Sequence, residues 1–206
     1  MNIILLSYYT TVDSKGGVEK VFCEMANEFV AKGHSVVAVC NELKQGMPFY
    51  KLDNNVEFEN IGREYKAATS KTFHKIRRLL ITDKKQRHVF DEVARGQVVS
   101  RLIQKYNPDL IISYGIDSTY DLKGILKTEI PVITMFHSNP NDILEKAGEK
   151  KIEALKDSIY VQVLTPGYVK VCNDSYKINN AICIPNIAPQ NVLNMSEKKN
   201  IIYTCW

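Results

Sequence analysis

Short apolar runs alternate along the chain with longer stretches in which apolar residues recur every three or four positions. The short runs predict strands that are covered on both faces. They lie at 2–7, 35–41, 56–61, 108–114, 131–136, 159–164 and 181–184. The longer stretches have the period of an amphipathic helix and predict helices at 17–32, 71–81, 86–105, 118–127, 141–156 and 166–174.

This alternation predicts an α/β fold with a doubly wound, mostly parallel sheet of the Rossmann-like kind. Ligands bind such sheets beyond the carboxyl ends of the strands. The segments that follow the predicted strands are therefore the places to look for a site: Tyr8–Gly17, Gly115–Ser118, His137–Asn141 and Thr165–Tyr168.

Two glycines lie at the predicted start of the first helix, at the end of the loop that follows the first strand. Gly16 and Gly17 directly precede an apolar helical face that begins at Val18. Glycine permits backbone with positive φ and a close approach of a ligand, and the free N–H groups of a helix start suit phosphate. Lys15 adds a positive charge beside them. The alternative is a tight turn that only packs the helix on the sheet.

Composition points to an ordinary α/β domain. The chain has 206 residues, of which 45% are hydrophobic and 24% charged, and its net charge is +4. No apolar run approaches the roughly 20 residues that span a bilayer, and the N-terminus lacks the pattern of a signal peptide. We therefore expect a cytoplasmic protein. Five scattered cysteines indicate reduced thiols, and we expect neither a metal site nor a cofactor.

Positive charge is concentrated in one segment. Residues 66–87 hold eight Lys and Arg residues and one acid, Asp83. An amphipathic basic helix can lie on an anionic membrane surface, which would place the protein on the inner face of the membrane. A solvated helix face fits equally, whereas no nucleic-acid fold accompanies the segment. The residues assigned to the membrane surface are Lys71, Lys75, Arg77, Arg78, Lys84 and Lys85.

Several stretches together resemble the N-terminal domain of the family-four glycosyltransferases. They are Gly16-Gly17-Val18-Glu19 before the first helix, Lys32-Gly33-His34-Ser35-Val36 after it, Pro108-Asp109, Val132–His137, Val163–Pro166 and Ile184-Pro185-Asn186. Enzymes of this family have the GT-B fold, in which two Rossmann-like domains face each other across a cleft. The resemblance implies transfer of a sugar from a nucleotide-sugar donor to a hydroxyl acceptor, with retention of configuration.

The resemblance also implies roles for particular residues. Gly16 and Gly17 would approach the donor diphosphate, and His137 would line the reaction centre. A histidine that only forms the pocket wall remains the alternative. Polar and aromatic residues near the strand ends are the acceptor-binding candidates, although the tyrosines among them would serve equally to pack the first loop: Tyr8, Tyr9, Asp117, Ser138 and Asn139.

The chain end predicts a second domain. Pro185–Pro189 has the composition of a rigid linker, and 199–206 begins an apolar run that resembles the first strand of the donor-binding domain. We therefore expect a Rossmann-like acceptor-side domain at 1–189, and a linker and first-strand stub at 190–206. A last strand on the edge of the same sheet is the alternative. Ile187 and Cys205-Trp206 depart from the family pattern, which has glycine and Gly-Arg there.

These expectations combine into one main functional hypothesis. The chain would be the acceptor-binding half of a glycosyltransferase that builds a cell-surface polysaccharide or glycolipid, and it would be inactive without a donor-binding domain or partner subunit. A stand-alone binding module for a separate catalytic subunit is the second hypothesis. A nucleotide-sugar epimerase-like domain is the third, although Gly16-Gly17 is not part of a G-x-G-x-x-G motif.

Overall fold

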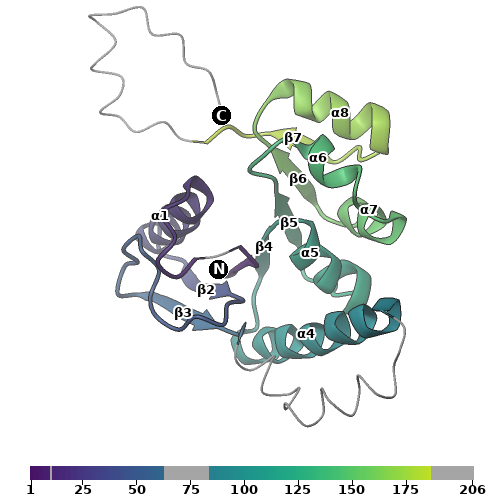
Figure 1. The fold of residues 1–206 in the computed structure, drawn as a ribbon. Helices are drawn as coiled ribbons and strands as arrows, with labels where there is room; N and C mark the ends of the chain where they lie inside the picture. Colours follow the sequence, from purple (N-terminus) through teal and green to yellow (C-terminus); the bar gives the residue numbers. More distant parts are fainter. Residues whose placement is uncertain (10, 63–83, 187–206) are drawn as a thin grey trace, which may run out of the picture.

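The computed structural model describes residues 1–9, 11–62 and 84–186. Within them, seven parallel strands form one sheet in the order β3-β2-β1-β4-β5-β6-β7 (Figure 1). The strands are β1 (Asn2–Ser7), β2 (Ser35–Cys40), β3 (Val56–Asn60), β4 (Leu110–Tyr114), β5 (Val132–Met135), β6 (Tyr160–Val163) and β7 (Ala181–Cys183). The predicted fold class and the seven strands predicted between residues 2 and 184 are confirmed.

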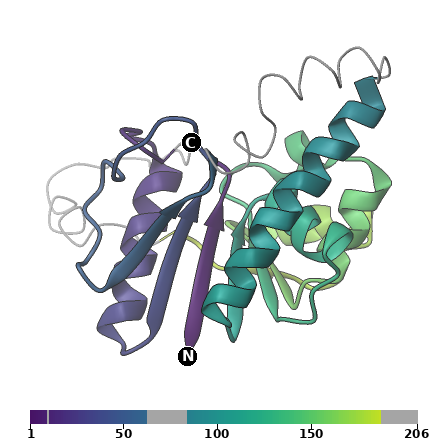
Figure 2. The same cartoon turned by 90° about the horizontal axis from the view of Figure 1, so that it is seen from below.

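Helices cover both faces of this sheet. Helix α1 (Gly17–Ala31) packs on one face, and α4 (Lys84–Tyr106) crosses the other (Figure 2). The remaining helices lie beside β4 to β7 (Figure 1): α5 (Ile116–Thr119), the π-helix η1 (Tyr120–Ile125), α6 (Pro140–Leu144), α7 (Glu149–Lys156) and α8 (Pro166–Tyr176). The predicted helix at 71–81 lies outside the described residues.

Two predicted helices differ from the structure in form. The stretch 118–127 is a short α-helix followed by a π-helix, in which the Leu126 amide bonds to the Asp121 carbonyl. The stretch 141–156 is divided in two, because Gly148 serves as the N-cap of α7 and glycine is unfavourable inside a helix. The predicted start of α8 is confirmed, with Thr165 as a side-chain N-cap and Pro166 as the first helical residue.

Successive residues of β1 point to opposite faces and build two hydrophobic layers. Ile3 and Leu5 pack with Phe22 of α1 on one face. Ile4 and Leu6 pack with α4 on the other, against a group that includes Val98, Val99 and Leu102. A third cluster joins β6 to α6, α7 and α8 through Phe136, Leu144, Leu155, Val161, Val163 and Cys172. The continuous apolar runs are thus strands that are covered on both faces.

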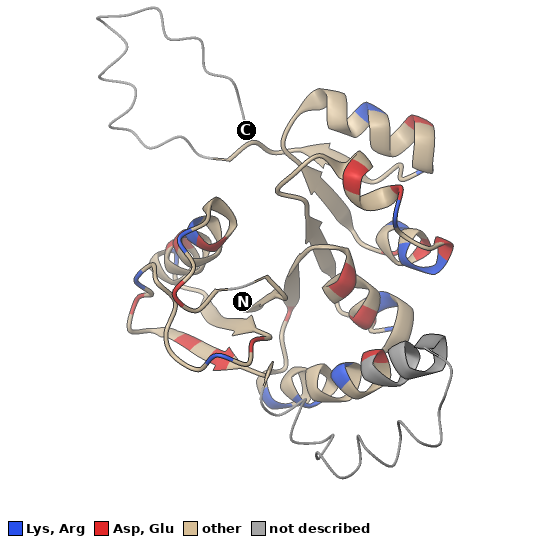
Figure 3. Ribbon diagram, in the orientation of Figure 1, with Lys and Arg blue, Asp and Glu red and all other residues tan. Residues whose placement is uncertain are grey.

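Charge is nearly absent from the sheet. Of its strands, only β3 carries charged residues, Glu57 and Glu59 (Figure 3). Because β3 is an edge strand, its charges oppose pairing with another chain.

The strand order reverses between β1 and β4. From β1 the chain builds outward to β2 and β3, and β4 then starts the other half of the sheet on the opposite side of β1. The loops that leave the carboxyl ends of β1 and β4 therefore diverge to helices on opposite faces (Figure 2). A crevice at this point is where doubly wound sheets bind ligands.

One glycine contact between two strand ends gives a direct test of the packing. A Cβ at Gly62, just after β3, would lie 1.9 Å from the backbone oxygen of Glu42, just after β2. We expect Gly62→Ala to lower the free energy of unfolding by about 1–3 kcal/mol, because backbone must shift to make room. Gly17→Ala is the control, since a Cβ there meets nothing within 4 Å. Equal urea midpoints for the two variants would contradict the described contact.

Candidate functional site

The carboxyl edge of β5 presents His137, the candidate for the reaction centre. Its ring stacks on the ring of Tyr114 from β4, with centroids 5.0 Å apart and planes 13° apart. Tyr114 in turn packs edge-on against Phe22 of α1, and its hydroxyl lies 3.2 Å from the Met25 sulfur. A single aromatic layer therefore separates His137 from α1.

His137 is partly buried, and its polar atoms lie on the buried side. Both ring nitrogens are buried, and neither has a hydrogen-bond partner among the described residues. Burial lowers the pKa of His137 from its ordinary value of 6.5 to about 4. The imidazole is therefore neutral at pH 7, with one nitrogen able to donate and the other able to accept a hydrogen bond.

The paired glycines lie at the start of α1, as predicted. Gly16 is the N-cap residue, and Gly17 is the first residue of the helix and is exposed. Neither glycine uses the positive φ that its residue type permits, because Gly16 has a φ of −74° and Gly17 is not among the residues with positive φ. What the glycines provide is space: a Cβ at Gly17 would meet no other atom within 4 Å.

An acidic side chain lies at this helix start. The Glu19 carboxylate folds back over Gly16, so that a Cβ there would lie 2.1 Å from Glu19 Oε2. The Ser14 hydroxyl donates to Glu19 Oε1 at 3.0 Å. The carboxylate takes the position that an anion at this helix terminus would favour, so an incoming phosphate would have to displace or move beside it.

The loop before α1 is fixed by the loop that follows β2. The Glu42 carboxylate accepts hydrogen bonds from the amides of Thr11 and Val12, the latter at 2.8 Å. The Tyr50 hydroxyl donates to the Lys15 carbonyl at 2.9 Å. The position of the segment around Gly16 thus depends on contacts with the loop after β2. No local sequence motif indicates these contacts.

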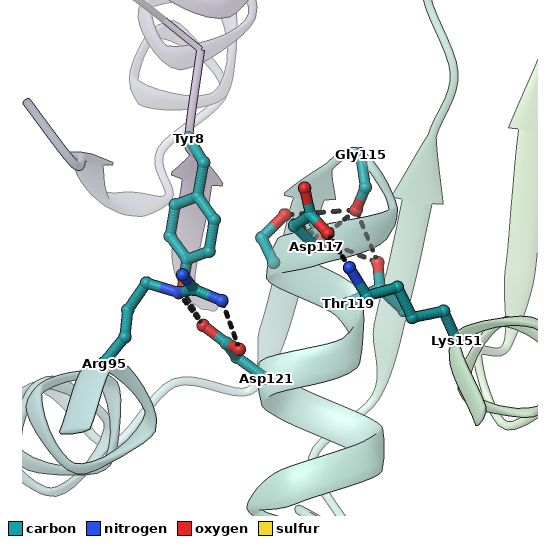
Figure 4. A network of polar contacts seen from close by, with 9 residues as sticks. Tyr8, Arg95, Gly115, Asp117, Thr119, Asp121 and Lys151 are labelled. Carbon is teal, nitrogen blue, oxygen red and sulfur yellow. Dashed lines mark hydrogen bonds and ion pairs between the residues drawn. The ribbon is translucent and has the colours of Figure 1, made fainter. Parts of the chain in front are cut away.

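Tyr8, an acceptor-binding candidate, has its hydroxyl engaged in a buried ionic cluster. It donates to Asp121 Oδ2 at 2.6 Å, and Arg95 from α4 holds the same carboxylate with two hydrogen bonds, one of them 2.9 Å from Nη2 to Oδ1 (Figure 4). Asp121 is fully buried and Arg95 is 16% exposed. Burial raises the pKa of Asp121, while the hydrogen bonds from Arg95 and Tyr8 oppose that rise. The cluster ties β1, α4 and η1 together.

Two further acceptor-binding candidates, Tyr9 and Asp117, lie close together beyond the end of β4. Asp117 is exposed and forms an ion pair with Lys151 of α7 (Figure 4). The Tyr9 ring lies against Gly115, where a Cβ would be 3.2 Å from the Tyr9 hydroxyl. The pKa of Tyr9 is raised by burial and by the nearby charge of Asp117. Tyr9 and Asp117 therefore share one patch of the carboxyl edge, even though more than 100 residues separate them in the sequence.

The last two acceptor-binding candidates follow His137. Ser138 is exposed. Asn139 is the N-cap of α6, and its side-chain oxygen accepts a hydrogen bond from the Asn141 amide at 3.1 Å. The contacts of Asn139 therefore give it a structural role at the start of this helix.

An apolar groove runs between α1 and the end of the sheet. It encloses about 240 Å³. Its walls include Val21, Met25, Phe29, Met135, Ile184 and Pro185. The lining also holds polar residues, Glu24, Glu28, Lys32, Gln162 and Asn186, but none of the site residues predicted from the sequence.

The basic segment lies mostly outside the described residues. This holds for Lys71, Lys75, Arg77 and Arg78, whereas Lys84 and Lys85 begin α4. No helix in the described part of the chain is long and apolar enough to cross a membrane. In the same residues, no three or more His, Cys, Asp or Glu side chains are grouped to hold a metal ion. The linker and strand stub from residue 187 onward also lie outside the description.

Two features of this edge were missed by the sequence prediction. Arg95 and Asp121 were not singled out, because residues of α4 and η1 meet only in the folded chain. Tyr114 was read as the last residue of a strand, and its support of His137 depends on pairing between β4 and β5. The available signals were an aspartate next to Leu122 in an apolar helix and an aromatic residue at a strand end.

The buried ion pair predicts a large effect of removing one partner. We expect Arg95→Met to lower the free energy of unfolding by about 3–5 kcal/mol, because Asp121 would remain buried without its cation. Lys151→Met breaks an exposed pair and should cost less than about 1 kcal/mol. Urea unfolding at pH 7 measures both. Combining Arg95→Met with Asp121→Leu should recover much of the loss, and failure to do so would contradict a charge-based cause.

The lowered pKa of His137 predicts a stability that depends on pH. Between pH 6.5 and about 4 the unfolded chain holds a proton on this imidazole that the folded chain does not. The stability contributed by the neutral ring is complete above pH 6.5 and falls by about 1.4 kcal/mol per pH unit as acid is added. We expect His137→Gln to remove this part of the difference between urea unfolding at pH 7 and at pH 5. His34→Gln is the control and should retain it.

Comparison with known proteins assigns the chain to a family. The family model described as Glycosyltransferase Family 4 matches residues 15–164, which is more than half of the chain. The match includes Gly16, Gly17, His137 and the ionic cluster apart from Tyr8. No match was found among curated proteins.

Solved structures with a similar fold are glycosyltransferases. Sucrose-phosphate synthase from Thermosynechococcus elongatus has a TM-score of 0.64 and 14% identity over 89% of this chain and 47% of its own. The lipopolysaccharide outer core galactosyltransferase WaaB has a TM-score of 0.58 and 10% identity over 91% and 46%. Starch synthase IV from Arabidopsis thaliana, bound to ADP and acarbose, has a TM-score of 0.58 and 11% identity over 90% and 51%.

The chain spans about half the length of these structures, and its fold is that of the N-terminal half of a GT-B glycosyltransferase. The family model covers the edge on which the candidate residues lie. The chain belongs to Glycosyltransferase Family 4.

Proposed function

We propose that the chain is the acceptor-side domain of an enzyme that moves a sugar from a nucleotide-sugar to a hydroxyl acceptor, with retention of configuration. The single observation that carries the proposal is His137 at the carboxyl edge of a family-four domain: its two ring nitrogens are buried and have no hydrogen-bond partner among the described residues, and its lowered pKa keeps the imidazole neutral. A buried polar group without a partner costs free energy. A sugar hydroxyl or a phosphate oxygen would supply the missing hydrogen bond.

The start of α1 is the proposed contact for the donor diphosphate. Transfer builds negative charge on the departing diphosphate, and backbone N–H groups at a helix terminus stabilise such charge. The open space at Gly17 supports this role, since a phosphate can approach the backbone there. The Glu19 carboxylate lies over Gly16 at this helix start. It would turn away when the donor binds.

The patch formed by Tyr9 and Asp117 is the proposed contact for the acceptor. The exposed Asp117 carboxylate accepts hydrogen bonds from hydroxyl groups, and the half-exposed Tyr9 ring offers a flat apolar face. Ser138, which is exposed and follows His137 in the chain, is a further proposed acceptor contact. Tyr8 would contribute through the position of the first loop, because its hydroxyl already bonds to Asp121.

Nucleotide, phosphate and donor-sugar contacts would come from a second domain or a partner subunit. Starch synthase IV, which shares this fold, was solved with ADP and acarbose, and WaaB is by its name a lipopolysaccharide outer core galactosyltransferase. We extend both hints to this chain: a nucleotide-sugar donor, and an acceptor in a cell-surface polysaccharide or glycolipid. Membrane contact through the basic segment 66–87 is part of the same proposal. The alternative of a stand-alone acceptor-binding module stays open, whereas the family match disfavours an epimerase-like domain.

Substitution of Gly17 tests the diphosphate contact. Gly17→Val should reduce turnover of a two-domain enzyme carrying this chain by at least a hundredfold, because its side chain occupies the proposed phosphate position. The fold should be unaffected, since no atom lies within 4 Å of the new Cβ. Release of nucleoside diphosphate from the donor measures the rate, and thermal unfolding verifies the fold. Unchanged turnover in a folded variant would remove the role of Gly17.

The reading frame beyond codon 206 separates the enzyme from the binding module. An open frame that continues into a second Rossmann-like domain with a Glu-x7-Glu element supports the transferase. A natural stop supports a module that acts with a separate catalytic subunit.

A further inference from the structure

The His137 ring has a stacking partner in place of a hydrogen-bonding one. Neither ring nitrogen has a hydrogen-bond partner among the described residues. A hydrogen bond at one ring nitrogen usually decides the state of the other nitrogen. Here the ring lies on the face of Tyr114 instead, with centroids 5.0 Å apart and planes 13° apart. Near-parallel aromatic rings at this separation attract each other, and the contact uses neither nitrogen.

Tyr114 is itself held on several sides. Its backbone pairs with Ser7 of β1 and with Met135 of β5, and the residue is 1% exposed. The Phe22 ring packs edge-on against its ring, with centroids 5.1 Å apart. The Tyr114 hydroxyl lies 3.2 Å from the Met25 sulfur. The Tyr114 ring therefore cannot move without opening the hydrophobic layer beneath α1.

His137 lies in the turn between two regular elements. Strand β5 ends at Met135, and α6 begins at Pro140. The Phe136 amide donates to the Gln162 carbonyl at 2.9 Å, which ties the residue before His137 to β6. Since neither β5 nor α6 contains His137, the orientation of its ring depends on side-chain contacts.

We propose that Tyr114 is a positioning residue that holds the His137 ring in the orientation used for sugar transfer. This rests on the proposed function, in which His137 lies at the reaction centre. The stack fixes the plane of the ring and leaves both nitrogens unpaired, so that each keeps its capacity to bond to a substrate. Loss of the Tyr114 ring should therefore lower the catalytic rate more than it weakens substrate binding.

Three substitutions separate positioning from packing. Tyr114→Leu removes the stacked ring, whereas Tyr114→Phe keeps it and loses only the hydroxyl next to Met25. Phe22→Leu is the matched control, because Phe22 is 1% exposed in the same hydrophobic cluster and its ring packs on Tyr114. Thermal unfolding verifies that each variant is folded. If Tyr114→Leu does not fold, Tyr114→Met, with a longer and more adaptable side chain, takes its place.

Nuclear magnetic resonance of the chain tests the stack without any substrate. The ring protons of His137, assigned by their absence in His137→Gln, are shifted upfield by the ring current of Tyr114. We expect Tyr114→Leu to lose this shift, and Tyr114→Phe and Phe22→Leu to retain it. An unchanged shift in Tyr114→Leu would overturn the proposal. So would an equal loss in Phe22→Leu, which would indicate general loosening of the cluster.

Kinetics of a two-domain enzyme carrying this chain test the consequence. We expect Tyr114→Leu to lower kcat by about ten- to a hundredfold with little change in KM, because a displacement of about 1 Å at a reacting group costs on this order. Tyr114→Phe and Phe22→Leu should keep the unaltered kcat. In an enzyme that already carries His137→Gln, Tyr114→Leu should cause no further loss, since Tyr114 acts through His137.

The same measurements distinguish failure of this proposal from failure of the proposed function. Full turnover of His137→Gln would remove His137 from the reaction centre, and the role of Tyr114 with it. A slow His137→Gln enzyme together with an unaltered Tyr114→Leu enzyme would overturn the role of Tyr114 alone. Losses that multiply in the double variant would also overturn it, because they would show that Tyr114 acts independently of His137.

Discussion

Parallel pairing is the constraint on which the candidate site depends. Because all seven strands run in one direction, every strand ends at the same edge of the sheet. The loops after β1, β4 and β5 therefore bring the start of α1, the patch around Asp117 and His137 to one side of the domain. The order reversal between β1 and β4 sends the neighbouring connections to opposite faces and leaves this edge open.

The polar groups behind this edge are paired, in contrast to His137. Five buried hydroxyl groups form a chain of hydrogen bonds of 2.7–2.9 Å that joins β4, α5 and β5: Ser113, Ser118, Thr119, Thr134 and Ser158. The buried charge of Asp121 is likewise met by Arg95 and Tyr8. Gln162 Oε1 on the neighbouring strand β6 also lacks a partner among the described residues, but His137 is the one residue of that part of the chain in which both polar side-chain atoms are buried and unpaired, and such groups need an explanation.

The sequence allowed the fold to be predicted because its signals are local. Apolar runs marked the strands, and Thr165-Pro166 marked the start of a helix. Failures occurred where a longer-range contact or an unusual turn decides the outcome. The π-helix at Tyr120–Ile125 has the same apolar spacing as an α-helix over so short a stretch. The candidate residues were placed at the correct edge, but the roles of Tyr8 and Asn139 depend on partners that sequence order does not reveal.

The burial of the His137 imidazole has a consequence for how the domain responds to acidification. With a pKa of about 4, the ring stays neutral throughout the physiological pH range. The charge of this side chain at the carboxyl edge is therefore constant over that range. Any change of this edge with pH near neutrality would therefore originate in groups other than His137.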